Sequence, residues 1–496
     1  MGLPLLREHF TADDFERFSE RLQEELEALR VLLGRRGFGV GPRSLGAELE
    51  LFLVDEVGHA LPVNEQVLER TADARVTEEL ARFNLECNPC PVPLAGRSFT
   101  ALGAECEDVL AEVRRAAATQ GARVVMVGTL PTLRLEDVGR DVLTPLPRYR
   151  VLSATWRDRR ESLQVTLSGE EPLVISWEDI TLAGAATSMQ YHLRVAPGEF
   201  ARAYNAAQLA TAPALAVGAN SPLLLGRRLW DETRIALLRQ VVDEEDEELC
   251  DVPEVPRHAR TSFGRGWVRQ GALELFEESV ALHAPVLPEV GPEEPRARLA
   301  EGGVPRLDAL RRHQGTVWTW NRAVFDPDAG GHLRIEFRAL PAGPTVVDMM
   351  ANGALLLGLT LGLSREVEAM LPGMPFLHAR GNFLRAARDG LDAVMLWPAA
   401  RAPSPRPVPV VQLLEELLPV AHAGLVEAGV EAGEADALLG IIRERLRTRR
   451  TGARWQRELL TLLEAHQPRA EALAALLARY QALSENGMPV HTWPLE

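Results

Sequence analysis

The sequence predicts an α+β protein built around an antiparallel sheet. Strand-like runs with alternating polar and apolar residues lie between amphipathic helical stretches, without the regular alternation of strand and helix that a parallel sheet requires. From residue 411 to residue 485 the pattern is helical almost throughout. We therefore expect a main domain over 1–400 with a loop-rich insert at about 243–315, and a helical C-terminal region over 411–496.

The individual elements follow from local periodicity and from turn residues. Helical spacing of apolar residues predicts helices at 11–33 (with Thr11 as N-cap), 98–120, 197–216, 231–243 and 345–364. Alternation or a short buried run predicts strands at 44–56, 82–90, 123–131, 186–195 and 332–340. The charged, proline-bearing segment 243–256 and the stretch 285–305 are predicted to be loops.

The strand at 44–56 carries two glutamates on one face. Side chains alternate along a strand, so Glu48 and Glu50 point one way while Leu49, Leu51 and Leu53 point the other way. The Cα atoms of the two glutamates would lie ~7 Å apart, close enough for both carboxylates to reach shared cations. A half-buried strand with a solvated outer face shows the same alternation, so the other strands decide between the two interpretations.

Three further strands repeat this arrangement. Their polar faces carry Asn84, Glu86 and Asn88 in the first, Ser188, Gln190, His192 and Arg194 in the second, and His332, Arg334, Glu336 and Arg338 in the third. Glutamate and histidine are metal ligands, and arginine binds carboxylates and phosphates in a bidentate manner. One antiparallel sheet would gather the four faces into a concave site for phosphate and for Mg²⁺ or Mn²⁺.

Motifs along residues 40–400 resemble, in the same order, those of one enzyme family. They are G-x-E-x-E at 46–50, E-x-N-P at 86–89, PRYRVL at 147–152, TSMQ at 187–190, GANSPLLLGRR at 218–228, RIEFRALPAGPTVVDMMAN at 334–352 and NFLRAARDGLDA at 382–393. The chain thus resembles the second glutamate–cysteine ligase family, carboxylate–amine ligases related to glutamine synthetase. The resemblance implies a glutamine-synthetase-like fold over 1–400, with a curved antiparallel sheet flanked by helices.

The resemblance also implies an ATP-dependent ligation. A substrate carboxylate, the γ-carboxylate of glutamate, would attack the γ-phosphate of ATP, and an amine such as cysteine would capture the acyl phosphate to form an amide. Metal binding is then assigned to Glu48, Glu50, Glu86, His192 and Glu336. Arg334 and Arg338 would contact the nucleotide phosphates and, with Glu50, serve catalysis.

Other residues are assigned to substrates by the same resemblance. Gln190, Arg228, Arg148 and Asn88 are the positions expected to hold the substrate carboxylate or amino group. Trp318 and Trp320 alternate on an expected strand, where core packing is the simpler interpretation, although one of them would also suit a nucleotide base.

Two functions of other classes remain open from the sequence. One is a non-catalytic sensor or scaffold that keeps the fold and binds a nucleotide or an amino acid, although such a copy would be expected to lose some of the acidic and arginine positions that this chain retains. The other is a guanidino or amine phosphotransferase. Only the ligase needs two co-substrates and releases phosphate.

Composition limits the partners. The chain of 496 residues has a net charge of -16, which gives no general attraction to nucleic acid or anionic membrane. The arginine-rich run at 443–454 is interpreted as a solvated helix end. The start of the chain lacks the pattern of a signal peptide, and the apolar window 345–363 contains Asp348 and Asn352. We expect a cytoplasmic protein with small-molecule partners, and a homo-oligomer remains open.

The four cysteines do not predict a functional site. Cys87 and Cys90 form a CxxC pair, but no second pair supplies the further ligands of a zinc site, and Pro89 and Pro91 exclude the helix of a thioredoxin-like motif. Sparse cysteines suit a reducing compartment.

Overall fold

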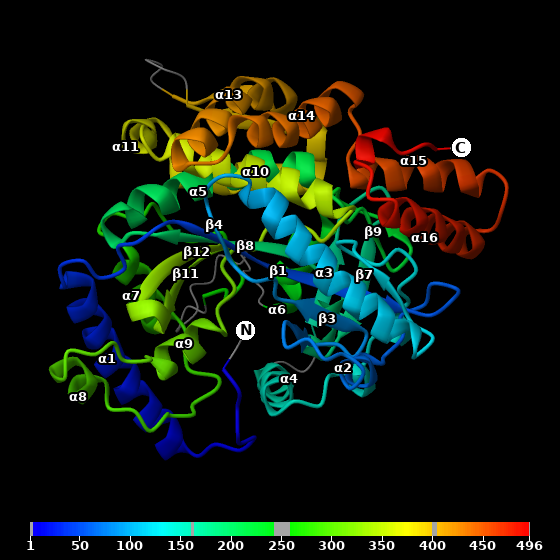
Figure 1. Cartoon of the computed structure of the whole chain (residues 1–496). Coiled ribbons are helices and arrows are strands. Elements are labelled where there is room, and N and C mark those ends of the chain that lie inside the picture. Colours follow the sequence, from blue (N-terminus) through cyan, green and yellow to red (C-terminus); the bar gives the residue numbers. More distant parts are fainter. Residues whose placement is uncertain (1–2, 160–162, 243–257, 399–403, 496) are drawn as a thin grey trace.

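The computed structural model describes residues 3–159, 163–242, 258–398 and 404–495 (Figure 1). A mainly antiparallel sheet lies at the centre, with strands in the order β11-β12-β8-β1-β3-β2 and with β4 and β5 also paired to β1. Its strands are β1 (Ser44–Val54), β2 (Val76–Glu78), β3 (Asn84–Cys87), β4 (Val92–Pro93), β5 (Arg123–Val125), β8 (Met189–Val195), β11 (Asn321–Asp326) and β12 (His332–Phe337). Separate strand pairs are β6 (Leu163–Leu167) with β7 (Leu173–Trp177), β9 (Leu223–Leu224) with β10 (Arg227–Arg228), and β13 (Val394–Trp397) with β14 (Arg406–Pro409).

Helices surround this sheet (Figure 1). In the first part of the chain they are α1 (Ala12–Gly34), α2 (Asn64–Leu68), α3 (Ser98–Ala118), α4 (Pro147–Arg159), α5 (Phe200–Gly218) and α6 (Thr233–Val242). The middle part forms α7 (Ala272–Leu282), α8 (Pro295–Ala300), α9 (Asp308–Gln314), α10 (Val346–Leu363), α11 (Val367–Met370) and α12 (Phe376–Asp389). The C-terminal part forms α13 (Val410–Ala428), α14 (Ala432–Thr448), α15 (Gly452–Glu464) and α16 (Arg469–Glu485).

One face of the sheet is apolar and belongs to the main hydrophobic core. Leu49, Leu51 and Leu53 of β1 are fully buried there, together with Tyr191 of β8 and Ile335 of β12. The same core includes the apolar sides of α3, α5 and α10. The predicted separation of the β1 leucines from Glu48 and Glu50 is therefore confirmed. The opposite face is polar as far as Glu50, and beyond it Phe52 and Val54 are buried in a second core.

The strand register brings these polar side chains together. His192 of β8 lies opposite Glu336 of β12, and Gln190 lies opposite Glu48 of β1. On the other side of β1, Glu50 lies opposite Glu86 of β3. Residues directly opposite each other in a sheet share a face and have neighbouring Cβ atoms. The register thus places the polar faces of four strands side by side.

The N-terminal helix begins where the sequence predicts. The hydroxyl of Thr11 accepts a hydrogen bond from the backbone N–H of Asp14 (3.3 Å), and the Asp14 carboxylate accepts one from the N–H of Thr11 (2.9 Å). This reciprocal capping satisfies two N–H groups that the first turn of a helix leaves without intrahelical partners.

The predicted buried helix is α10. Within the described residues it is the one helix long and apolar enough to cross a membrane, yet 89% of it is buried inside the protein. The helix α13, the first of the C-terminal helices, packs closely against it: a Cβ added to Gly424 would overlap the carbonyl oxygen of Gly358. Such a contact is closer than any side chain allows, so glycine is required where the two helices meet.

The C-terminal helices are part of the main body. Apolar residues of α13 and α14 join the main core, and those of α15 and α16 form a second core with Phe52 and Val54 of β1. A buried ion pair, Arg445 with Asp348 at 2.7 Å, also connects α14 to α10. The C-terminal helices therefore pack on the main domain and do not form an appended unit.

The insert and some strand limits differ from expectation. The region 258–315, predicted to be loop-rich, contains α7, α8 and α9, because the spacing of apolar residues in 272–282 outweighs the surrounding glycine and proline. The predicted loop 243–256 lies outside the described residues. The strand expected at 123–131 ends at Val125, and Trp318 and Trp320 precede β11 instead of lying on it.

Candidate active site

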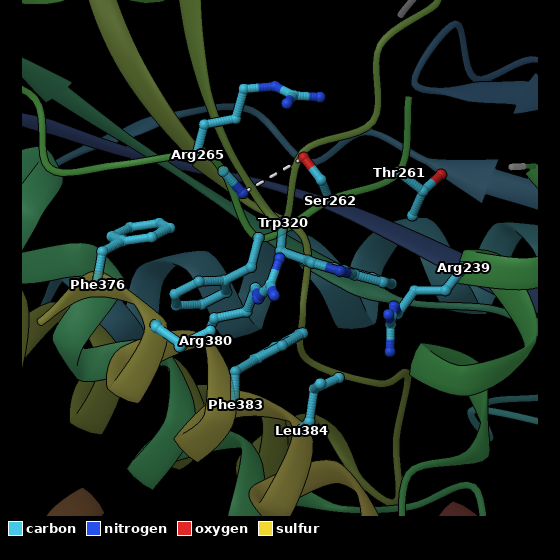
Figure 2. Close-up of a pocket in the computed structure, with 12 residues that line it drawn as sticks. Arg239, Thr261, Ser262, Arg265, Trp320, Phe376, Arg380, Phe383 and Leu384 are labelled. Atoms are coloured by element: carbon cyan, nitrogen blue, oxygen red, sulfur yellow. Dashed lines mark hydrogen bonds between the residues drawn. The ribbon is translucent and has the colours of Figure 1, made fainter. Parts of the chain in front are cut away.

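The polar face of the sheet lines a cavity of about 680 Å³. A second cavity, of about 260 Å³, adjoins it, and the side chains of Thr261 and Trp320 line both (Figure 2). Trp320 is 3% exposed and packs with its ring 5.6 Å from that of Phe383, so it belongs to the core as well as to the cavity walls. The larger cavity contains the acidic residues expected from the sequence.

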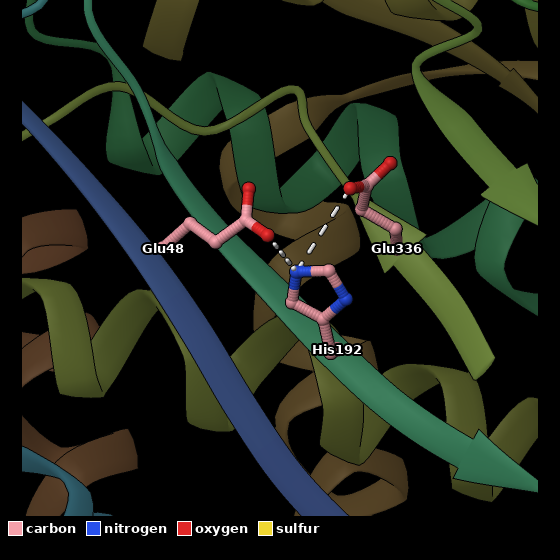
Figure 3. A group of neighbouring side chains, drawn as sticks. All are labelled: Glu48, His192 and Glu336. Atoms are coloured by element: carbon pink, nitrogen blue, oxygen red, sulfur yellow. Dashed lines mark ion pairs between the residues drawn. The ribbon is translucent and has the colours of Figure 1, made fainter. Parts of the chain in front are cut away.

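One acidic cluster combines Glu48, His192 and Glu336 from three adjacent strands (Figure 3). The Nε2 atom of His192 lies 3.3 Å from a carboxylate oxygen of Glu48 and 3.9 Å from one of Glu336. His192 is 5% exposed, and neither ring nitrogen has a hydrogen-bond partner within the described residues. A buried imidazole without such partners, beside two carboxylates, fits a cation that accepts nitrogen and oxygen ligands.

A second acidic cluster combines Glu50, Glu79 and Glu86. Neutral groups donate hydrogen bonds to it: the Ser188 backbone N–H to Glu50 at 2.7 Å, the Gln190 amide to Glu50 at 2.8 Å, and the Leu80 N–H to Glu79 at 2.7 Å. In each cluster the ligand oxygen or nitrogen atoms lie within 4.8 Å of one another. Neutral donors leave the negative charge of three neighbouring carboxylates largely uncompensated.

The two clusters differ in protonation because neutral donors surround Glu50, whereas arginines surround Glu336. Burial and the charge of Glu79 raise the pKa of Glu50 to about 7, and burial together with Glu48 raises that of Glu86 to about 8. For Glu336, burial acts in the same direction, but the guanidinium groups of Arg322 and Arg338 outweigh it and hold the pKa at about 2. The cluster around Glu50 therefore holds protons up to about neutral pH, and a divalent cation bound there would take their place.

Arginines from the edge of the sheet border the acidic residues. Arg322 of β11 donates to both carboxylate oxygens of Glu336, and Arg338 lies 3.3 Å from Glu336 while donating to the amide oxygen of Gln190. Arg334 lies 3.3 Å from Asp326, and its Nε–H has no hydrogen-bond partner within the described residues. These fixed guanidinium groups are suited to binding anionic oxygens next to the acidic clusters.

Most residues predicted from the sequence line the larger cavity. They are Glu48, Glu50, Glu86, Arg148, Gln190, His192, Trp320, Arg334, Glu336 and Arg338. Arg228 is elsewhere: it lies 3.6 Å from Glu171 and donates to Glu464 of α15. Asn88 does not line the cavity either, but its amide donates to Glu86 at 2.9 Å and so orients that carboxylate.

Sequence reasoning missed two residues of the site, Glu79 and Arg322. Glu79 directly follows the short strand β2, whose Thr77 pairs with Glu86 of β3, and so it joins the cluster through register alone. Arg322 pairs with Glu336 across β11 and β12. The alternation of polar and apolar residues in NRAVFD was the available signal for Arg322.

Comparisons with known proteins show the family and the fold of the chain. Residues 44–479 match the model of glutamate–cysteine ligase family 2. A search of curated protein sequences finds no match. The chain is similar to the solved glutamate–cysteine ligase of Francisella tularensis in complex with AMP, with a TM-score of 0.55 and 9% identity over 92% of this chain and 90% of that chain. It also resembles a bifunctional glutathione synthetase from Pasteurella multocida, with a TM-score of 0.47 and 12% identity over 93% of this chain and 53% of that chain. The fold is glutamine-synthetase-like, as the sequence resemblance implies.

Proposed function

Because the chain belongs to glutamate–cysteine ligase family 2, we propose that it is an ATP-dependent carboxylate–amine ligase that joins the γ-carboxylate of glutamate to an amine such as cysteine. The observation that carries the proposal is the pair of acidic clusters, Glu48 with His192 and Glu336, and Glu50 with Glu79 and Glu86, in one cavity bordered by arginines. Bringing a carboxylate anion to a triphosphate requires positive charge, which the arginines and the cations held by the acidic clusters would supply.

Divalent cations fit the two clusters. The buried nitrogens of His192 without hydrogen-bond partners, and the raised pKa values of Glu50 and Glu86, both indicate ligands whose charge and lone pairs are not satisfied by protein groups. Mg²⁺ or Mn²⁺ held there would neutralise the phosphate oxygens of the nucleotide. Asn88 and Gln190 fix the carboxylates of Glu86 and Glu50 through their amide N–H groups.

The proposed reaction has two steps. A carboxylate oxygen of the substrate attacks the γ-phosphorus of ATP, the bond to the bridging oxygen breaks, and ADP leaves. The amine nitrogen then attacks the acyl carbon, phosphate leaves with its oxygen, and the nitrogen loses a proton to become an amide. Arg334 and Arg338 would bind and orient the transferring phosphoryl group, since both line the cavity beside Glu336.

The test is ADP and phosphate release with Mg²⁺, glutamate and a panel of amines that includes cysteine. We expect release of both products to depend on the amine and an amide to appear, and we expect Glu50→Gln to abolish the release. ADP formed with a phosphorylated acceptor would instead show a phosphotransferase. Tight ATP binding without turnover for any amine would show a sensor, and either result would contradict the proposal.

Mg²⁺ should stabilise the protein more at high pH than at low pH. Glu50 and Glu86 titrate at about 7 and 8 when folded, above the ordinary value of 4.5, so the folded protein binds more protons in this range. The stability that they contribute is present below about pH 4.5 and is lost as the pH rises through 7 to 8. A cation replaces these protons. We expect the melting temperature in EDTA to fall as the pH rises, and the gain on adding Mg²⁺ to grow.

Differential scanning fluorimetry at about pH 6 and about pH 8.5 measures both effects. Glu86→Gln removes the carboxyl group with the higher pKa. The gain in melting temperature on adding Mg²⁺ should then differ less between the two pH values. A Mg²⁺-dependent gain that is equal at both pH values, or larger at the lower one, would show that these carboxylates do not bind the cation.

A further inference from the structure

The smaller cavity is basic and aromatic, in contrast to its neighbour. Its volume is about 260 Å³, and no acidic residue of the described chain lines it. Three arginines do, each from a different element: Arg239 from α6, Arg265 from the loop before α7, and Arg380 from α12 (Figure 2). The net charge of the protein is -16, so a cavity whose charged lining residues are all cationic indicates an anionic ligand.

Two of these arginines keep their charge available. Neither Arg239 nor Arg265 forms an ion pair or a hydrogen bond through its side chain with any residue that the structure describes. Arg265 also lines a neighbouring cavity together with Glu278, on whose carboxylate its charge acts, but the two side chains form no ion pair. Guanidinium groups without a protein acceptor beside a cavity are suited to a carboxylate.

Aromatic and aliphatic side chains form much of the remaining wall, beside Thr261 and Ser262. The rings of Phe263 and Phe383 stack with centroids 4.8 Å apart, and Phe376 lies 5.8 Å from Phe263. Leu377, Leu384 and Trp320 also line the cavity, and Trp320 faces the larger cavity as well (Figure 2). A ligand that fills the smaller cavity therefore needs an apolar body as well as an anionic group.

Of the three reactants, only the amine acceptor matches both properties. The adenine base of ATP could stack on the aromatic rings, but it carries no negative charge for the guanidinium groups to bind, and the phosphates would be held by the cations proposed for the larger cavity. Glutamate is polar throughout and gains nothing from aromatic walls. We propose that the smaller cavity binds the carboxylate and the apolar body of the acceptor, an amino acid with an apolar side chain, while its amine reaches past Thr261 and Trp320 into the larger cavity. This assignment rests on the proposed ligase function.

Direct binding to the full chain without ATP tests the cavity itself. The probe is 3-phenylpropionate, with the uncharged 3-phenylpropionamide as its counterpart, measured by isothermal titration calorimetry. We expect the acid to bind the wild-type protein, and to bind the R239Q/R265Q variant at least about tenfold more weakly, since hydrogen bonds to charged groups have this magnitude. R269Q is the matched control, because Arg269 is exposed and lines neither cavity.

Absence of binding to the wild-type protein, or equal affinity in R239Q/R265Q, would overturn the proposal. The single variants R239Q and R265Q replace the double variant if its circular dichroism shows that it does not fold. In turnover, 3-phenylpropionate should raise the KM of the amine without changing that of ATP, and R239Q/R265Q should raise the KM of amino-acid acceptors more than that of their decarboxylated counterparts.

Competition with ATP instead of the amine would overturn the acceptor assignment. If the probe binds as expected but no amine supports ADP release, the ligase function fails, and the acceptor role fails with it, while the anion-binding cavity stands. The two failures are thus distinguished by different measurements.

Discussion

Glu48→Gln is expected to lower amine-dependent ADP release by about 10³-fold, a loss of the size seen when one group that stabilises transition-state charge is removed. Glu48 belongs to the cluster with His192 and Glu336, and its carboxylate oxygen lies 3.3 Å from the His192 ring. The variant keeps the shape of the side chain and one oxygen but removes the negative charge that a cation requires. The loss should therefore appear in kcat and in the Mg²⁺ concentration needed for half-maximal rate.

Glu56→Gln is the matched control, because Glu56 follows the same strand and is exposed at a turn. It should leave both parameters unchanged. Burial raises the pKa of Glu48, but the surrounding charges, those of His192 and Arg338 among them, outweigh burial and hold it well below its ordinary value, so Glu48→Gln should lower the melting temperature. The rates are therefore compared at a temperature at which both proteins are folded. If Glu48→Gln retains more than a tenth of the wild-type rate, the metal-binding role of Glu48 is contradicted.

Arg445→Met is expected to destabilise the protein by about 3–5 kcal/mol, the cost of leaving one partner of a buried ion pair without the other. Arg445 is 1% exposed and donates to the Asp348 carboxylate at 2.7 Å and to the Asn352 side chain at 2.6 Å. Asp348 is fully buried and also accepts hydrogen bonds from Thr345 and from the backbone N–H of Val490. Without Arg445 its charge would stay in the core uncompensated.

Urea unfolding gives the free energy directly. The control is Arg447→Met on the same helix, because the Arg447 side chain is 69% exposed and, among the described residues, forms an ion pair only with Glu444. It should change the free energy by less than about 0.5 kcal/mol. Asp348→Asn combined with Arg445→Met should cost less than Arg445→Met alone, since no buried charge is then left. Equal losses in the single and double variants would show that packing, and not charge, determines the cost.

The part of the site that the sequence predicted is the part that strand periodicity encodes. Alternation alone places Glu48 with Glu50, and His192 with Gln190, on one face of each strand, and the structure confirms both pairs. Periodicity does not specify which strands are neighbours or in what register they pair. The sequence therefore predicted the residues of the two acidic clusters except Glu79, whose place depends on the pairing of Thr77 with Glu86.

Tertiary contacts account for the other differences. Arg228 ends a loop that resembles a motif of the family, and this loop is buried beside the core. Its guanidinium, however, donates to Glu464 of α15, more than two hundred residues later in the chain. No local pattern reports such a pairing. Likewise, the helical character of 411–485 was evident from spacing, whereas its burial against α10 depends on glycines in both helices that fit one another only in three dimensions.

The close contact between Gly358 and Gly424 bears on how the chain can be truncated. The helix α10 is as apolar as a membrane span; α3, α5 and the sheet cover one part of it, and α13 and α14 cover another. A fragment that stops near residue 400 would carry that helix without the cover of α13 and α14. It should be recovered in inclusion bodies or bound to detergent micelles, even though every proposed metal ligand lies within it. The acidic site is thus encoded in the first four-fifths of the chain, whereas the solubility of that part is encoded in the last fifth.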